Sequence, residues 1–149
     1  MSNPIEQPNT NGKSGYVSVN GLDMYYEIHG EGQPLVLLHG AFSAIGTSFG
    51  KILPGLAERR QVIAFVLQGH GRTGDIDRPL AMVGMMEDVA AALPKLGIEQ
   101  TDVFGYSSGA SVALHLATRH PNLLHKLVLM SVSYTLNGVH PGLMEGLGE

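Results

Sequence analysis

The sequence predicts a single α/β domain, in which helices flank a mostly parallel sheet. Residues 34–40 and 61–67 are predominantly apolar, as expected of strands covered on both faces. Helical periodicity at 80–97 lies between such strands, and alternation of strands with crossover helices favours parallel pairing. The chain has 149 residues, 44% of them hydrophobic and 15% charged, which suits one buried core rather than two.

The first element is a predicted hairpin. Two β-rich runs, 15–20 and 22–28, flank Asn20-Gly21, and Asn-Gly between such runs favours a type I′ turn because both central residues need a positive φ. The hairpin is expected to form an antiparallel edge of the sheet. Residues 1–14 are polar and are interpreted as a flexible tail rather than a signal peptide.

The middle of the chain predicts two helices around a strand. Helical spacing of Phe49, Ile52 and Leu56 predicts a helix within 41–60, which Pro54 should kink or shorten. The strand at 61–67 follows. The helix at 80–97 carries one apolar face, which core packing explains better than a special site; this face comprises Met82, Met85, Met86, Val89 and Leu93.

The last predicted elements are a strand at 101–107, a helix from 108 closed by Pro121, and a strand at 125–131. The core is therefore expected to run from 15 to 133. Residues 134–149 have little periodicity and predict a loop or a short helix.

Composition excludes several classes of partner and site. The formal net charge is −4 and no basic run occurs, so neither nucleic acid nor an anionic membrane surface is an expected partner. No cysteine is present, which rules out disulfides and a thiolate nucleophile. No apolar run approaches the ~18 residues of a membrane-spanning helix, and a cytoplasmic location is expected.

A candidate nucleophile lies between the strand at 101–107 and the helix after it. Gly105-Tyr106-Ser107-Ser108-Gly109 has the pattern GxSxG, in which the serine occupies a sharp strand-to-helix turn and the glycines remove side chains that would collide. A helix that begins at Ser108 directs its free N–H groups at developing negative charge. The alternative is a glycine-rich turn used only for packing.

A second motif strengthens the catalytic interpretation. His39-Gly40-Ala41-Phe42 follows the strand at 34–40, and a turn there can point the Ala41 amide at Ser107. The Ala41 and Ser108 amides would then form an oxyanion hole. His39, Gly40, Phe42 and Tyr106 are expected to line the site.

These segments together resemble the α/β-hydrolase fold superfamily, in its esterase, epoxide-hydrolase and haloperoxidase-like branch. The resemblance rests on LVLLHGAF, QGHGRT, VFGYSSGA and a helix ending in RHP before KLVLMS, and it covers only the N-terminal part of that fold. Relatives with epoxide-hydrolase or dehalogenase chemistry have aspartate at the elbow, so Ser107 implies a carboxylesterase-type reaction. The resemblance implies a small ester-like substrate, no cofactor and no metal, and it leaves secretion open.

The sequence also departs from this family. The resemblance places the triad acid and histidine further along, after a cap, and 134–149 is expected to be the start of this cap or an irregular tail. Activity is therefore expected to be impaired or to depend on a partner. The alternative is a non-catalytic fragment or an engineered minimal domain. His39 and His70 are expected to brace their loops rather than replace the missing base. Relatives commonly have aspartate and arginine near Val66 and Gln68. His70, Asp75 and Asp77 have no known metal-ligand spacing.

The last strand predicts self-association. Residues 126–131 would form an apolar edge with unpaired backbone groups, and such edges bind a further strand. A homodimer or a complementing partner is expected at this edge.

Overall fold

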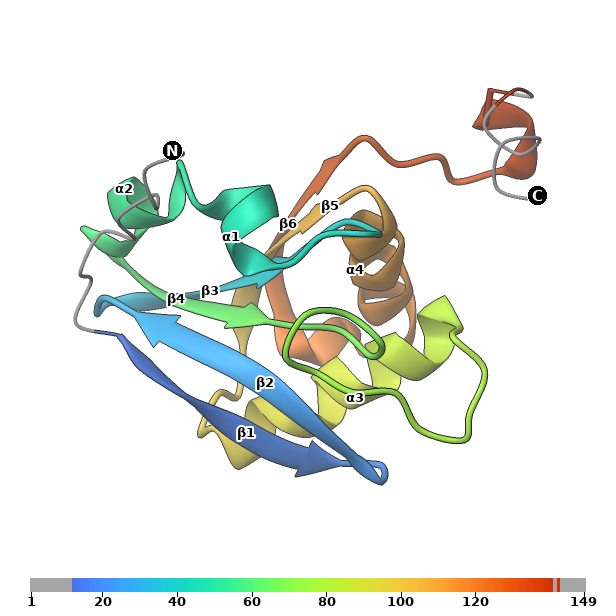
Figure 1. The fold of residues 1–149 in the computed structure, drawn as a ribbon. Coiled ribbons are helices and arrows are strands. Elements are labelled where there is room, and N and C mark those ends of the chain that lie inside the picture. Colours follow the sequence, from blue (N-terminus) through green and yellow to red (C-terminus); the bar gives the residue numbers. More distant parts are fainter. Residues whose placement is uncertain (1–11, 141, 143–149) are drawn as a thin grey trace, which may run out of the picture.

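The computed structural model describes residues 12–140 and 142, and it contains a six-stranded sheet with helices on both faces (Figure 1). The strands are β1 (Lys13–Val19), β2 (Leu22–His29), β3 (Gln33–Leu38), β4 (Arg60–Phe65), β5 (Thr101–Tyr106) and β6 (Leu124–Met130). The helices are α1 (Ile45–Phe49), α2 (Leu53–Ala57), α3 (Met82–Lys95) and α4 (Ser108–Arg119), with 3-10 turns η1 (Pro121–Leu123) and η2 (Leu136–Gly138).

The predicted mostly parallel sheet is confirmed. Its strand order is β1-β2-β4-β3-β5-β6, in which β4, β3, β5 and β6 are parallel. The hairpin β1–β2 adds antiparallel pairing at one edge. Asn20 and Gly21 have φ values of 50° and 81°, the positive values that the predicted type I′ turn requires.

Helices cover the two faces of the sheet unequally (Figure 1). The larger core cluster lies under α3 and α4 and includes the predicted apolar face of α3, namely Met85, Met86, Val89 and Leu93, with Met82 partly buried against it. The smaller cluster lies under α1 and α2, where the Phe49 ring meets Phe104 edge-on at 5.5 Å between centroids. Leucine and methionine side chains at helical spacing therefore build the core, as predicted.

The single helix predicted within 41–60 is wrong, because two short helices take its place. Pro54 lies in the first turn of α2, where its missing N–H costs nothing and its fixed φ suits the start of a helix. Ile45, Phe49 and Leu53 face the smaller core, whereas Ile52 is 44% exposed between the helices. The proline therefore starts a new helix rather than bending an existing one.

The ends of the chain fall partly outside the described residues. Of the predicted tail 1–14, residues 1–11 lie outside, and β1 begins at Lys13. Of the predicted irregular segment 134–149, residues 141 and 143–149 lie outside. Within the described part of the chain, no helix combines the length and apolarity needed to cross a membrane.

β6 forms the second edge of the described sheet. It pairs with β5 alone, and Val128 and Met130 are 54% and 46% exposed. The register places Val128 beside Phe104 and Met130 beside Tyr106, so these side chains share one face of the sheet. The predicted self-association through this edge remains a prediction.

Candidate active site

Ser107 occupies a sharp turn between β5 and α4. Its φ and ψ are 54° and −117°, a region that residues other than glycine seldom enter and that costs about 1–3 kcal/mol. The Ser107 N–H donates to the Met130 carbonyl of β6 at 2.9 Å, and the Ser107 carbonyl accepts from the amides of Ala110 and Ser111 at 3.0 and 3.2 Å. Three backbone hydrogen bonds therefore hold the strained residue in place.

The two glycines of the motif permit this turn sterically. A Cβ atom on Gly105 would lie 2.5 Å from the Gly109 carbonyl oxygen, and one on Gly109 would lie 2.1 Å from the Leu38 carbonyl oxygen. Contacts this short do not occur for real side chains. Glycine at both positions therefore lets α4 begin directly against the ends of β3 and β5.

The turn after β3 lies against the nucleophile turn. A Cβ atom on Gly40 would be 3.4 Å from the Ser107 Cβ and 3.1 Å from the Tyr106 ring. Gly40 is buried, and its N–H donates to the Ser48 Oγ at 3.3 Å. The structure thus brings together three of the residues predicted for the site, namely Gly40, Tyr106 and Ser107.

His39 braces this turn through both ring nitrogens. Nε2 accepts the Leu67 N–H at 2.9 Å, which leaves Nδ1 to donate to the Gly40 carbonyl at 2.8 Å. Burial lowers the pKa of His39, and nearby His70 lowers it further, although the hydrogen bond to Gly40 acts the other way. A neutral imidazole with both nitrogens occupied cannot take a proton from Ser107.

Four further histidines also have other contacts. His70 packs its ring edge-on against His39 at 5.0 Å and directs Nδ1 to the Gln68 carbonyl at 2.9 Å. His29, His120 and His125 contact Glu27, Glu87 and Asp102, respectively. Within residues 12–140, no histidine hydrogen-bonds to the Ser107 hydroxyl.

The loop after β4 is held by polar contacts that include Gln68, where the resemblance led us to expect other residues. Buried Gln68 donates to Asp75 Oδ1 at 2.7 Å and accepts from the Arg78 Nε at 2.9 Å. Arg78 in turn pairs with the buried Asp88 carboxylate at 2.7 Å. The side chains of this loop are thus satisfied by one another, and among the described residues no group of three metal-ligating side chains could hold an ion.

The other predicted site residues belong to the same two turns. Ala41 follows Gly40, and Ser108 is the first residue of α4, whose opening amides have no partner within the helix. Their role as oxyanion donors stays a prediction. Phe42 is 89% exposed with a φ of 54°, which is unusual for a bulky aromatic residue.

Backbone strain marks a feature that sequence reasoning missed. Phe42, Ser107 and Ser131 have φ values of 54°, 54° and 57° and follow β3, β5 and β6, respectively. These three strands are neighbours in the sheet. Left-handed residues thus converge at the carboxyl ends of three parallel strands, where ligand sites of open α/β sheets form. No residue-type signal identifies Phe42 or Ser131 in this role, because neither residue favours a positive φ.

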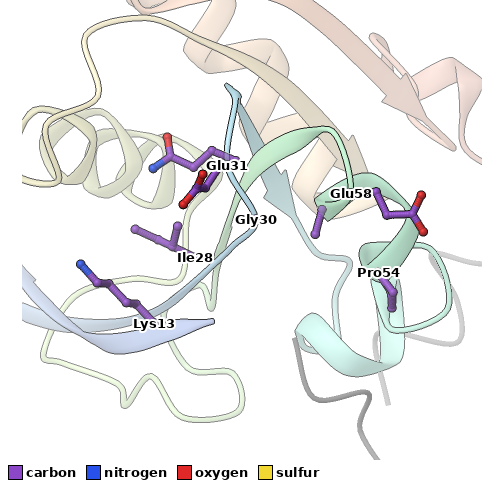
Figure 2. A pocket seen from close by; sticks show the side chains of 8 residues that line it. Lys13, Ile28, Gly30, Glu31, Pro54 and Glu58 are labelled. Carbon is purple, nitrogen blue, oxygen red and sulfur yellow. The ribbon is translucent and has the colours of Figure 1, made fainter. Parts of the chain in front are cut away.

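Two hollows lie at the opposite end of the sheet. The larger, of about 540 Å³, is shown in Figure 2 and is lined by Lys13, Ile28, Gly30, Glu31, Pro54, Ala57, Glu58 and Gln61. The smaller, of about 130 Å³, lies beside Asp102 and His125. Both adjoin the starts of parallel strands, roughly 20 Å from their carboxyl ends at the usual rise of a strand, so neither belongs to the Ser107 site.

Comparison with known proteins identifies the family of this chain. The sequence profile of the alpha/beta hydrolase fold matches residues 33–147. A pimeloyl-[acyl-carrier protein] methyl ester esterase from Aeromonas hydrophila is 38% identical, covering 75% of this chain and 42% of its own. A soluble epoxide hydrolase from a Corynebacterium is 33% identical, covering 76% of this chain and 40% of its own.

Solved structures agree as well. Est816, described as an N-acyl homoserine lactone degrading enzyme, superposes with a TM-score of 0.81 at 26% identity, covering 89% of this chain and 51% of its own. The chain therefore spans less than half the length of the curated relatives above. The profile match extends over most of the sequence and includes both turns at Ser107, and the chain belongs to the alpha/beta hydrolase fold family.

Proposed function

We propose that this chain carries the nucleophile of a serine hydrolase of carboxylesterase type, with a small-molecule ester as substrate. The observation that carries the proposal is the left-handed Ser107 at the tight β5–α4 turn, with the Gly40 turn packed against it. Backbone strain of this kind persists where the surrounding structure enforces it, and it collects at active sites. The esterase among the relatives is consistent with this chemistry.

The reaction begins when the Ser107 Oγ attacks the ester carbonyl. A bond forms between Oγ and the carbonyl carbon, the carbonyl π pair moves to oxygen, and the hydroxyl proton passes to a base. The Ala41 and Ser108 amides stabilise the resulting oxyanion. The intermediate then expels the alkoxide, which takes up a proton to leave as alcohol, and water hydrolyses the acyl-enzyme.

The base is the incomplete part of this site. His39 has both nitrogens occupied and a lowered pKa, so it does not supply the base, and we assign this role to a group beyond the described residues or on a partner. Oxyanion stabilisation and binding without a complete triad still give about 10³-fold acceleration over water in other serine hydrolases. The chain alone should therefore be acylated slowly and turn over poorly.

Acetylation by p-nitrophenyl acetate tests the proposal. We expect peptide mass mapping to find an acetyl group on Ser107 of the unmodified chain and none in the Ser107→Ala variant. Ser131→Ala is the matched control, because Ser131 is also a left-handed serine after a parallel strand, and it should leave acetylation of Ser107 unchanged. Acetylation confined to lysines, at equal rates in all three proteins, would refute the proposal that Ser107 is the nucleophile.

A further inference from the structure

Three apolar side chains come from backbone that borders Ser107. Phe42 lies two residues after Gly40, Tyr106 precedes Ser107, and Met130 pairs with Tyr106 in the parallel register. The Tyr106 ring lies against Gly40, and the Met130 carbonyl accepts the Ser107 N–H. We call Phe42, Tyr106 and Met130 the apolar rim.

The rim can reach a group bound at Ser107. Two residues of extended chain span at most about 7 Å, and a phenylalanine ring adds several more. Gly40 itself lies beside Ser107, so the Phe42 ring is within reach of an acyl chain attached to the serine. Tyr106 and Met130 share one face of the sheet next to the same turn.

Core packing accounts for Tyr106, which lies against the smaller core cluster, but not for Phe42 and Met130. Phe42 and Met130 are 89% and 46% exposed, and large apolar side chains gain free energy when they leave water. Phe42 combines this exposure with a positive φ, a backbone conformation that costs a bulky residue free energy. A ligand that covers the ring would recover the lost hydrophobic free energy.

The three turns that border Ser107 contain no formally charged side chain. Residues 39–44, 106–109 and 130–134 contain no aspartate, glutamate, lysine or arginine. His39 is buried between two backbone partners, and His70 packs against it with Nδ1 on the Gln68 carbonyl. A carboxylate or ammonium on the acyl group would therefore lose its hydration without gaining an opposite charge from these segments.

We propose that the acyl group of the substrate is uncharged and apolar, an alkyl or aryl chain, and that it lies on the apolar rim with Phe42 as the main specificity-determining residue. This inference rests on the proposed function, because it assumes that the acyl carbonyl is bound at Ser107. It adds the chemical class of the acyl group and names the side chains that select it.

The test compares acylation of Ser107 by three p-nitrophenyl esters: the acetate, the hexanoate and the hemiglutarate, which is of similar length to the hexanoate and carries a carboxylate. Rates are measured by peptide mass mapping and corrected with the Ser107→Ala variant. We expect the hexanoate to react about tenfold faster than the acetate, since four additional methylenes are partly buried, and the hemiglutarate to react no faster than the acetate.

Substitutions in the apolar rim test whether its side chains cause the preference for the hexanoate over the acetate. In Phe42→Ala the ratio of hexanoate to acetate rates should fall to about 2, and Phe42→Leu should retain most of it, because leucine also offers apolar area. Tyr16→Ala is the control, since Tyr16 is an aromatic residue that is 59% exposed on β1, at the opposite edge of the sheet. It should leave the ratio unchanged.

The outcomes separate the two proposals. If no ester acylates Ser107, the proposed function is overturned and the apolar acyl class falls with it. If Ser107 is acylated but Phe42→Ala keeps the tenfold ratio, or if the hemiglutarate reacts fastest, only the inference about the rim is overturned.

Discussion

The two ends of the parallel strands differ in the kind of residue they present. At the starts of the strands lie both hollows and an ion-pair cluster, in which Asp102 contacts Arg60 at 2.6 Å and His125 at 3.2 Å. At their carboxyl ends lie three residues other than glycine with a positive φ, and the turns at 39–44, 106–109 and 130–134 contain no charged side chain. The starts of the strands are polar, whereas the carboxyl ends carry backbone strain at residues other than glycine.

This difference suggests that backbone strain, rather than a hollow, identifies the candidate active site. Strain is retained only where packing enforces it. In this chain the strain, rather than the cavity, coincides with the sequence motif around Ser107.

The largest effect on the free energy of unfolding is expected at Gly109, which has the tightest contact at the carboxyl ends of the strands. Gly109→Ala would place a Cβ atom 2.1 Å from the Leu38 carbonyl oxygen and 2.4 Å from that of His39. The free energy of unfolding should fall by about 3 kcal/mol or more, as for severe overpacking. Urea unfolding followed by circular dichroism measures this loss.

Gly55→Ala is the matched control for that substitution. Gly55 lies in α2 and nothing would lie within 4 Å of its added Cβ, so alanine should stabilise the fold by about 0.5–1 kcal/mol. Equal effects of the two substitutions would mean that the β3–α4 contact is looser than described.

The polar end should respond to pH. Burial alone would raise the pKa of Asp102, but hydrogen bonds from Arg60 and His125 outweigh it and lower the pKa below 3.8. The ionised carboxylate therefore stabilises the folded state fully above this value, and the stabilisation is lost as the pH falls through 3.8 towards the folded pKa.

Asp102→Asn isolates that contribution. It should lower the free energy of unfolding by about 1.5 kcal/mol at pH 7, the value typical of hydrogen bonds to a charged group, and by much less at pH 2.5. Unfolding curves at the two pH values provide the measurement. A cost that is the same at both pH values would show that packing, rather than charge, holds this end together.

Relief of strain is the next smaller effect. Ser107→Gly should raise the free energy of unfolding by about 1 kcal/mol, because glycine adopts the φ of 54° without steric cost. Ser108→Gly, one residue later in the first turn of α4, should instead destabilise by roughly 0.5 kcal/mol. Thermal unfolding distinguishes the two, and a destabilising Ser107→Gly would argue against strain at the elbow.

The smallest effect on stability is expected at β6, the edge strand that runs between the two ends of the sheet. Val128→Lys should change the free energy of unfolding by less than about 0.5 kcal/mol, since Val128 is 54% exposed. If the chain pairs through β6, as predicted, the charge should shift it towards monomer in analytical ultracentrifugation. A mass distribution identical to that of the unmodified chain would place any association elsewhere.

Much of the fold could be predicted because local rules and packing agree. The Asn20-Gly21 turn, the apolar face of α3 and the strand-turn-helix around Ser107 each combine a residue type with a single favoured conformation. The helix predicted within 41–60 was wrong, because the periodicity of Phe49, Ile52 and Leu56 gave no information about where the chain would break. Pro54 suits a helix start as well as a kink.

The site was predicted in part for the same reason. Glycines in a sequence motif indicate positions where backbone segments pack closely. Gly105 and Gly109 therefore predicted the tight turn around Ser107, and the structure places backbone atoms against both glycines. The left-handed Phe42 and Ser131 could not be predicted, because their conformations are imposed by tertiary contacts and oppose their own preferences. The bracing role of His39 was expected, although its two backbone partners emerge only from the fold.

Site-resolved labelling with a fluorophosphonate tests the nucleophile most directly. The reagent phosphonylates serines, and the oxyanion donors at Ser107 should accelerate its reaction by about 100-fold over Ser131, which shares the left-handed conformation. We predict modification of Ser107 in the unmodified chain, none at Ser131, and no site-specific modification in Ser107→Ala. Equal, slow modification of both serines would contradict the claim that the turn at Ser107 builds a nucleophile.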